Sequence, residues 1–324
     1  MHVAVTGAAG HLGAALVRQL LEDGHTVRAL VFQDDRALKG LPVRLIHGRL
    51  HDPETLLRLC DGVEVAQHLA GRISIGEVPE RDLWHTNVAG VNLLIEACKV
   101  TGVRRLIYFS SAHAFRARPD MAELDETAPP AQAYPYERTK AAAQALVLNS
   151  NGQNGLETMS LNPTSVLGPW DFKPSLQGRM LLDLYHRRIP ILTPGGYDWV
   201  DNRDVALAAS AAMTRGRPGE VYLLSGQYVT LLELATMFGA ITGRPMPGTA
   251  LPFWLLKLLA RPAGWWGRLT GQRPLFTREA ISHVESGHRK VSHEKASREL
   301  GYSPRPLEET LNETWEWLRQ NHQS

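Results

Sequence analysis

The chain has 324 residues, of which 44% are hydrophobic and 21% are charged, and its formal net charge is +2. This composition excludes wholesale disorder, and the length suits about two domains with a substantial core. Because the basic residues are scattered along the chain, no nucleic-acid partner is predicted.

Two further features of the sequence bear on where the protein works. The two cysteines, Cys60 and Cys98, can neither cross-link a chain of this size nor form a zinc site by themselves, which favours a reducing compartment and no metal. No apolar run approaches the ~20 residues that span a bilayer, and the N-terminus lacks the basic segment of a signal peptide. We therefore expect a cytoplasmic protein without a transmembrane segment.

Short β-branched runs alternate with helical patterns through the first half of the chain. The predicted strands are residues 2–5, 26–32, 43–46, 63–69, 105–109 and 158–161. The predicted helices are residues 12–21, 88–98 and 136–148. This alternation is typical of a parallel sheet covered on both faces by helices, which is the doubly wound, Rossmann-type α/β class.

A glycine-rich turn, Thr6-Gly7-Ala8-Ala9-Gly10-His11-Leu12-Gly13, joins the first strand to the first helix. Glycine gives such a turn its backbone freedom and lets a pyrophosphate approach the main chain, while the helix N-terminus presents unpaired N–H groups to the anion. Since the motif follows a strand and opens a helix, it predicts a dinucleotide site formed by Gly7, Gly10, His11, Leu12 and Gly13.

Tyr136 and Lys140 stand four residues apart and so share one face of a predicted helix. An ammonium group beside a phenol favours the phenolate and lowers the pKa of the tyrosine from about 10. Such a tyrosine exchanges a proton with an alcohol or a ketone near neutral pH. The alternative interpretation is a tyrosine that packs on a lysine stem.

Ser110 and Ser111 follow the strand at 105–109. In a parallel sheet, ligands bind beyond the carboxyl ends of the strands, so a hydroxyl group here is placed to bond a substrate carbonyl. Serines at strand ends are also common turn formers, and this second interpretation stays open.

The pattern changes after Gly168, where prolines and glycines become frequent. Residues 205–213 and 221–224 predict one more helix and one more strand of the same sheet. We therefore assign residues 1–168 to a dinucleotide-binding domain, to which residues 198–226 return. Residues 169–197 and 227–324 are assigned to a smaller, mostly helical substrate-binding lobe.

Together these motifs resemble the extended short-chain dehydrogenase/reductase superfamily of the NAD-dependent epimerase/dehydratase type. The matching segments are the turn at 6–13, His68-Leu69-Ala70-Gly71, Asn87-Val88-Ala89-Gly90, Ser111, Tyr136 with Lys140, Asn162-Pro163, and 295–304. The resemblance implies that Tyr136 is a general acid/base, that Lys140 lowers its pKa and holds the nicotinamide ribose, and that Ser111 polarises the substrate. It also implies cofactor contacts from Leu50, Leu69, Ala70, Gly71, Asn87, Tyr136, Lys140 and Pro163.

The end of the second strand departs from the family at the place where NAD and NADP are distinguished. An acid there bonds the adenosine ribose, and a nearby arginine accommodates a 2′-phosphate, but this chain has Val31 and Phe32. Arg36 follows and could hold the phosphate, whereas Asp34 and Asp35 would repel it. We predict NADP, with NAD as the alternative, and Phe32 and Arg36 as cofactor contacts.

A second departure lies after the third strand, where relatives usually have an aspartate near the adenine and this chain has Arg49. A third is Tyr197, which stands where nucleotide-sugar epimerases commonly carry an arginine that clamps the diphosphate. Arg203 is close by, before an Asp204 expected to cap a helix, and is interpreted as solvated.

Residues 162–174 resemble the dihydroflavonol-reductase-like branch of the superfamily. We therefore predict an NAD(P)-dependent oxidoreductase that moves a hydride between nicotinamide and a carbonyl or alcohol of a small molecule. The alternatives are a nucleotide-sugar epimerase or dehydratase, which Asn162 favours, and a non-catalytic dinucleotide-binding sensor or scaffold.

Four other features receive interpretations without catalytic roles. Trp170, Phe172 and Tyr185 are interpreted as core aromatics, with the lining of a pocket as the alternative, and the two cysteines as packed helix residues. Residues 252–266 are rich in tryptophan and leucine and form a membrane-surface contact, a lid or a packed helix. Helices at 88–100 and 136–149 are the candidates for a homodimer interface.

Overall fold

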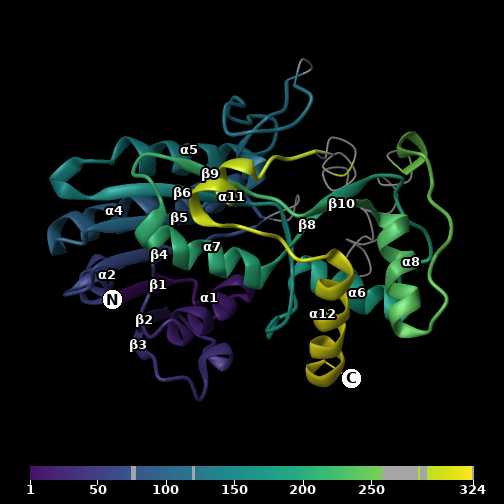
Figure 1. Cartoon of the computed structure of the whole chain (residues 1–324), viewed down its shortest axis with the longest axis horizontal. Helices are drawn as coiled ribbons and strands as arrows, with labels where there is room; N and C mark the ends of the chain where they lie inside the picture. The colour runs from purple at the N-terminus through teal and green to yellow at the C-terminus, as the bar shows by residue number, and fades with distance from the viewer. Residues whose placement is uncertain (74–77, 119–120, 257, 259–283, 285–289, 323–324) are drawn as a thin grey trace.

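The computed structural model describes residues 1–73, 78–118, 121–256, 258, 284 and 290–322, and its main feature is a seven-stranded parallel sheet (Figure 1). The strands run in the order β3-β2-β1-β4-β5-β6-β9. Their bounds are β1 His2–Thr6, β2 Thr26–Val31, β3 Arg44–His47, β4 Val65–His68, β5 Arg105–Phe109, β6 Glu157–Pro163 and β9 Val221–Leu224. The predicted doubly wound α/β class is confirmed.

Strand β1 pairs with both β2 and β4, and every ladder of the large sheet is parallel. From β1, the next two strands in the chain, β2 and β3, therefore lie on one side, and all later strands, beginning with β4, lie on the other side. A ligand crevice forms where the strand order reverses, beyond the carboxyl ends of the strands. In this chain that place is the edge at which the glycine-rich turn leaves β1.

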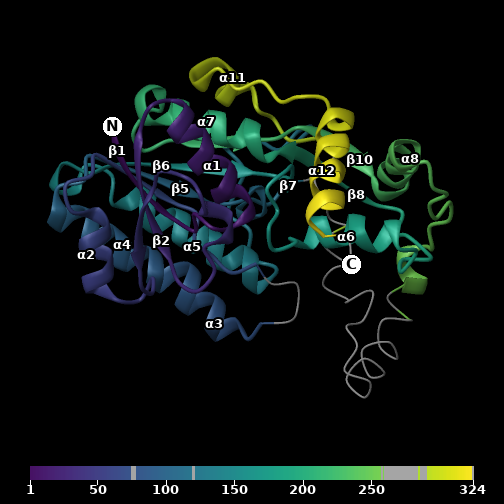
Figure 2. The same cartoon turned by 90° about the horizontal axis from the view of Figure 1, so that it is seen from below.

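Helices cover both faces of the large sheet, as Figure 2 shows. One face carries α1 His11–Glu22, α7 Asn202–Arg215 and α11 Glu294–Leu300, which share a core with β1. The other face carries α2 Pro53–Cys60, α4 Gly90–Thr101 and α5 Pro135–Asn149. Strands β4 and β5 are buried along their whole length because both their faces are covered.

The lobe expected to be mostly helical also contains a three-stranded sheet, which the sequence analysis missed. Its strands are β7 Ser165–Leu167, β8 Gly196–Asp201 and β10 Gln227–Thr230, in the order β10-β8-β7. Residues 198–226 were expected to return to the large sheet, and only part of this segment does so. Helix α7 packs on the large sheet and β9 is one of its strands, whereas β8 lies in the small sheet.

Three helices surround the small sheet: α6 Leu176–Tyr185, α8 Leu231–Thr242 and α12 Leu307–Asn321. They share a core that includes Trp199, Phe238 and Trp315. Tyr185 packs on Trp315, with ring centroids 4.3 Å apart, so its interpretation as a core aromatic is confirmed. Cys60 and Cys98 are buried between α2 and α4, also as expected.

Two expectations about surfaces can be compared with the described residues. No helix in the described ranges has both the length and the apolar character needed to cross a bilayer. Of residues 252–266, only 252–256 and 258 are described; Trp254 is 68% exposed and Leu256 is buried, and the rest of this segment lies outside the described residues.

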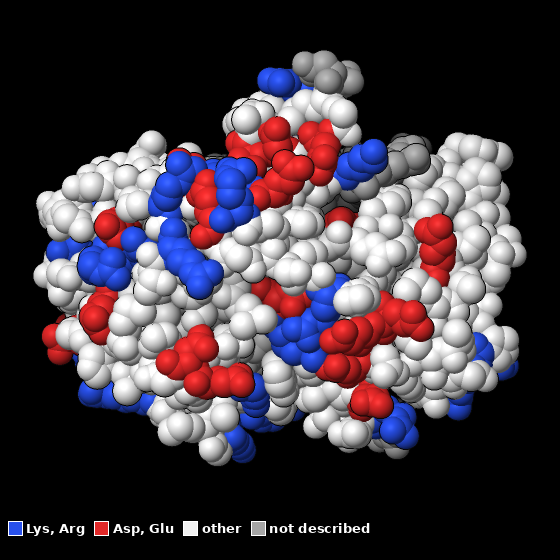
Figure 3. All heavy atoms as spheres, viewed as in Figure 1, with Lys and Arg blue, Asp and Glu red and all other residues white. Residues whose placement is uncertain are grey.

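Acidic and basic side chains are interleaved on the face of the molecule in Figure 3. Ion pairs of the described residues include Arg217–Glu299 and Lys295–Glu220, at 2.7 and 2.6 Å. These charged side chains are therefore neutralised by their partners.

Arg105 on β5 is a buried cation that joins three elements. Its Nε and Nη2 donate to Oε2 of Glu157 at 2.8 and 2.6 Å, and its Nη1 donates to the carbonyls of Ala212 and Met213 at 2.8 and 2.9 Å. Those carbonyls lie in the last turn of α7, where an α-helix leaves its acceptors unpaired. Arg105 thus fastens the end of α7 to the centre of the sheet.

We expect Arg105→Met to lower the free energy of unfolding by about 2 kcal/mol, because two helix carbonyls and a carboxylate lose a buried donor. Arg104→Met is the matched control, since Arg104 bonds the same Glu157 oxygen at 3.1 Å with a side chain that is 49% exposed. Surface ion pairs contribute little. Urea unfolding of both variants measures the difference, and equal losses would contradict the role given to Arg105.

Candidate active site

The glycine-rich turn forms a tight cradle at the carboxyl end of β1. Gly7 has a φ of +72°, and a Cβ atom there would lie 2.6 Å from the backbone nitrogen of Ala70. A Cβ atom on Gly13 would lie 2.1 Å from the carbonyl oxygen of Gly7. Both positions therefore require glycine, and the turn packs directly against the segment that follows β4.

Helix α1 begins right after this turn, with Gly10 as its N-cap and no side chain bonded to its first N–H groups. These N–H groups and the helix dipole make the start of α1 a site for an anion such as a pyrophosphate. His11 bonds the carbonyl oxygen of Gly168 through Nε2 at 3.0 Å, so the turn also contacts the entrance to the smaller lobe. Leu12 packs against the core.

The opposite wall of the crevice is formed by Gly71, Asn87 and Lys140, which the structure brings together. A Cβ atom on Gly71 would lie 3.4 Å from Oδ1 of Asn87 and 3.9 Å from Nζ of Lys140. Asn87 is buried in a π-helical turn, His85–Ala89, and its amide accepts from the nitrogen of Arg72 at 2.7 Å and donates to its carbonyl at 2.9 Å. Such turns are frequent at functional sites.

Ser111 and Tyr136 meet at the carboxyl edge of the sheet. Both side chains are buried, and the Ser111 hydroxyl lies close enough to Tyr136 to counter part of the rise in the pKa of its phenol. Ser111 follows β5 and precedes a short 3₁₀ turn, Ala112–Ala114. Tyr136 lies in the first turn of α5, and α5 packs against this 3₁₀ turn. The two hydroxyls that the sequence selected therefore lie within reach of one substrate oxygen.

Lys140 lies one helical turn beyond Tyr136, but its ammonium group bonds other partners. Its Nζ donates to the carbonyl of Phe109 at 2.7 Å and to the hydroxyl of Tyr108 at 3.3 Å. Burial lowers the pKa of Lys140 to about 7. Burial also raises the pKa of Tyr136 to about 12, against the opposing hydrogen bond from Ser111.

The expected lowering of the Tyr136 pKa by Lys140 is therefore not found. Desolvation disfavours the phenolate and the ammonium alike, and it is the largest influence on both groups. The sequence places the two residues on one helix face, but it does not show that this face is buried against β5.

The Lys140 pKa predicts how stability depends on pH. The pKa is about 7 in the folded protein and about 10.5 in the unfolded chain, so between these values the unfolded chain holds a proton that the folded one lacks. The free energy of unfolding therefore rises with pH. From pH 7.5 to 9.5, we expect the wild type to gain about 2 kcal/mol more than Lys140→Met. Urea unfolding at both pH values measures this, and parallel changes would contradict the assigned pKa.

Asn162, which the sequence analysis treated as an indication of an epimerase, is fully buried beneath Ser111. Its amide donates to the carbonyl of Ser111 at 2.8 Å and to Gln144 at 2.7 Å, and it accepts from Ser160 at 2.7 Å. The side chain thus fixes the backbone of Ser111 from β6. Pro163 follows it as the last residue of β6 and pairs with Leu224 of β9.

A small pocket opens next to Ser111. Its lining residues are Ala112, His113, Thr164, Ser165, Tyr197, Asp198 and Val291. The large, weakly polar Tyr197 side chain lies at the position discussed above for the diphosphate clamp, and burial raises its pKa to about 12. Asp198 accepts from the hydroxyl of Thr164 at 2.6 Å and the nitrogen of Gly226 at 2.8 Å, which holds this wall together.

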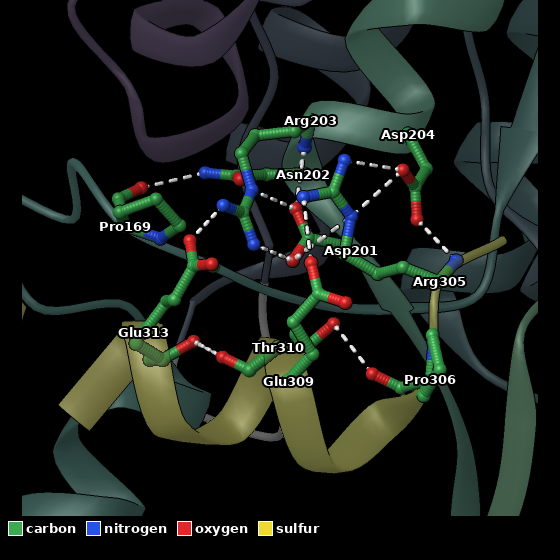
Figure 4. A network of polar contacts seen from close by, with 12 residues as sticks. Pro169, Asp201, Asn202, Arg203, Asp204, Arg305, Pro306, Glu309, Thr310 and Glu313 are labelled. Atoms are coloured by element: carbon green, nitrogen blue, oxygen red, sulfur yellow. Dashed lines mark hydrogen bonds and ion pairs between the residues drawn. The ribbon is translucent and has the colours of Figure 1, made fainter.

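The interpretation of Arg203 as solvated is wrong. Its guanidinium group pairs with Asp201 at 2.7 Å and also with Glu313 of α12, and its side chain is 17% exposed (Figure 4). The helix cap is Asp201, whose carboxylate accepts from the nitrogen of Arg203, and not Asp204. Asp204 instead pairs with Arg305 at 2.7 Å, so this network fastens the start of α7 to the C-terminal segment.

The residues expected at the adenosine end follow β2. Phe32 is exposed, and Arg36 begins a short 3₁₀ turn, Arg36–Leu38. The Arg36 guanidinium group is engaged by Asp34, with Nε–Oδ1 and Nη2–Oδ2 distances of 3.0 and 2.7 Å. Hydrogen bonding to Arg36 lowers the pKa of Asp34 to about 2. Leu50 lies further along the edge, against Gly90 of α4.

The residues present fit a dinucleotide. At Gly7 and Gly13 the turn is packed too closely for a side chain, which leaves its backbone N–H groups at the start of α1 accessible to a pyrophosphate, and Gly71, Asn87 and Lys140 lie together beyond it. Thr6 and Tyr108 were not among the site residues expected from the sequence. They connect the strand end at the glycine-rich turn and the strand end at Lys140 to the neighbouring elements. Thr6 bonds Nδ1 of His68 at 2.6 Å, and Tyr108 accepts from Lys140. Both are polar residues within apolar strands, which is the one signal that singles them out.

The fold and the crevice define a two-lobed, Rossmann-type dinucleotide-binding protein. The model of the NAD dependent epimerase/dehydratase family matches residues 3–225, and the chain belongs to this family. The predicted family and the prediction of an NAD(P)-dependent oxidoreductase are confirmed.

Similar proteins match along nearly their whole lengths. "Sterol demethylase protein B" of Methylococcus capsulatus is 36% identical, with 99% of both chains covered. A protein of Synechocystis provisionally named dihydroflavonol 4-reductase is 29% identical, with 98% of this chain and 94% of the relative covered. The crystal structure of gox2253 has a TM-score of 0.86 and 32% identity, covering 99% of this chain and 98% of the other.

Proposed function

We propose that the protein interconverts a ketone and a secondary alcohol on a mostly apolar small molecule, with Tyr136 as the general acid/base. The observation that carries this proposal is the pair of buried hydroxyl groups of Ser111 and Tyr136, which lie near each other beside a pocket. Two hydroxyl donors that converge on one point are suited to a substrate oxygen that gains or loses a proton.

In the direction of reduction, Tyr136 gives its phenolic proton to the substrate oxygen, and Ser111 donates a second hydrogen bond to the same oxygen. When bound, the reduced cofactor NAD(P)H would supply the hydride in this direction, and the oxidised cofactor NAD(P)+ would accept it in the other. Because burial raises the pKa of Tyr136 to about 12, its hydroxyl is protonated at neutral pH and is ready to act as the acid.

Lys140 is proposed to hold the nicotinamide ribose. Its bond to the carbonyl of Phe109 fixes Nζ at the end of β5, and Gly71 lies next to it. The residues proposed to hold the rest of the dinucleotide are Gly7, Gly10, His11, Leu12, Gly13, Phe32, Leu50, Leu69, Ala70, Gly71, Asn87 and Pro163, whereas Arg36, also expected from the sequence, is occupied by Asp34.

The pocket and the relatives together support an apolar substrate. Ala112, Tyr197 and Val291 give the pocket apolar surface beside four polar lining residues, and its described lining contains no arginine that would clamp a diphosphate. The relatives named above are designated for a sterol and for a dihydroflavonol. Both compounds are ring systems with hydroxyl or keto oxygens, and this chemistry matches a Ser–Tyr pair beside an apolar wall.

The test is the absorbance of reduced nicotinamide with purified protein and a panel of substrates. The panel contains keto and hydroxy forms of a sterol, a dihydroflavonol and, as the alternative class, UDP-glucose. We expect net oxidation or reduction of the nicotinamide with at least one ring ketone or alcohol and no conversion of UDP-glucose. Epimerisation of UDP-glucose without net change in the nicotinamide would overturn the proposed substrate class.

A further inference from the structure

The adenosine end of the crevice contains a cation that the family pattern does not assign. NADP differs from NAD by one phosphate on the adenosine ribose, which lies near the ends of β2 and β3 in this fold. The described residues at these strand ends include Phe32, Asp34 and Arg36 after β2, and Arg49 after β3. A residue here that presents a positive charge without a partner would favour the phosphate.

Arg36 is not such a residue, because Asp34 already occupies its guanidinium group. Two parallel hydrogen bonds join them, and their opposite charges cancel at short range. Asp35 adds a negative charge next to the pair. A phosphate that approached Arg36 would therefore approach at least one carboxylate as well, at a cost in Coulomb energy.

Arg49 is in a different position. Its guanidinium carbon lies 4.9 Å from the centre of the Phe32 ring, and that ring is 54% exposed. Arg49 forms no ion pair with any acidic side chain in the described ranges. An arginine over an aromatic face keeps its edge N–H groups available, and this fork matches a phosphate.

The backbone holds Arg49 at the end of β2. Val31 pairs with His47 in the parallel register, and the nitrogen of Gly48 donates to the carbonyl of Val31 at 3.0 Å. The residue after Gly48 is therefore fixed beside the residue after Val31. Lys173, on the segment after Gly168, adds a further positive charge near Asp34, whose pKa its charge helps to lower.

We propose that Arg49, supported by the ring of Phe32, binds the 2′-phosphate of NADP and makes this protein prefer NADP to NAD. This proposal rests on the dinucleotide crevice of the family and is independent of the substrate proposed above. It differs from the expectation drawn from the sequence, in which Arg36 binds the phosphate.

The test compares the dissociation constants of NADPH and NADH, measured by titration calorimetry on folded protein. For Arg49→Gln, we expect NADPH to bind ten- to a hundredfold more weakly, on the order of one charge-assisted contact, and NADH to change less than about twofold. Arg36→Gln is the matched control, because it removes the same charge from a residue already paired. It is expected to change either constant by less than about threefold.

Two further measurements separate this proposal from a structural role of Arg49. Phe32→Leu keeps an apolar side chain but removes the ring, and we expect NADPH to weaken by about two- to fivefold while NADH is unchanged. Raising the salt concentration should reduce the wild-type preference for NADPH but not that of Arg49→Gln. Arg49→Gln serves as its own fold control through NADH, which must still bind.

Three results would overturn the proposal. They are equal losses for both cofactors in Arg49→Gln, loss of the preference in Arg36→Gln instead, and a wild type that binds NADH more tightly. A wild type that binds neither dinucleotide would refute this proposal together with the cofactor site, whereas failure of the substrate panel alone leaves these titrations unaffected.

Discussion

Tyr136→Phe is expected to lower kcat by 10²- to 10⁴-fold while dinucleotide binding changes little. Phenylalanine keeps the ring in its buried place but lacks the proton that the substrate oxygen would receive, and general acid/base catalysis typically contributes a factor of this size. Steady-state kinetics with a substrate from the panel gives kcat, and titration calorimetry gives the cofactor dissociation constant.

Tyr185→Phe is the matched control for this change. Tyr185 packs on Trp315 and beneath Arg244 in the smaller lobe, away from the crevice. Loss of its hydroxyl is expected to leave kcat within about twofold, as for most substitutions outside a catalytic group. A Tyr136→Phe protein that keeps more than about a third of the wild-type rate would refute the acid/base assignment.

Gly13→Val is expected to weaken dinucleotide binding more than tenfold. The first side-chain atom would lie 2.1 Å from the carbonyl oxygen of Gly7 and 2.8 Å from Cα of Ala8, so the turn must open to accept it. Opening the turn moves the start of α1 away from the pyrophosphate. Calorimetric titration with NADH and NADPH measures the loss after circular dichroism has shown that the variant is folded.

Gly10→Ala provides the same test with less distortion, because its Cβ atom would lie 3.2 Å from the same oxygen. We expect a smaller loss of affinity with the fold intact. Gly248→Ala is the control, since a Cβ atom there meets nothing within 4 Å. If folded Gly13→Val binds both cofactors as the wild type does, the glycine-rich turn is not the dinucleotide site.

The features that the sequence predicted well are those whose causes lie close together in the chain. The turn at 6–13 carries its own glycines and directly joins the first strand to the first helix. The structure places the strand, the turn and the helix as expected. Tyr136 and Lys140 share a helix, and Ser111 follows a strand whose apolar character is evident. Their catalytic roles remain predictions that the variants above would test.

The features that the sequence did not show depend on distant partners. Arg203 was interpreted as a solvated arginine because one of its partners, Glu313, lies 110 residues further along the chain. The sign of the Tyr136 pKa shift depends on burial by β5 and α5 together, which no local pattern contains. Strands β7 and β10 are three and four residues long, too short to give a clear alternation.

The packing of α11 has a consequence for how the chain folds during synthesis. Ala296, Leu300 and Tyr302 are buried in the same core as α1 and β1, so the first-made strand and helix share a core with residues made almost last. Domains usually fold as units while the ribosome is still at work. Here the core of the nucleotide-binding domain is completed only after residue 302 has left the ribosome. Until then, part of the face of α1 and α7 stays uncovered and open to contact with chaperones.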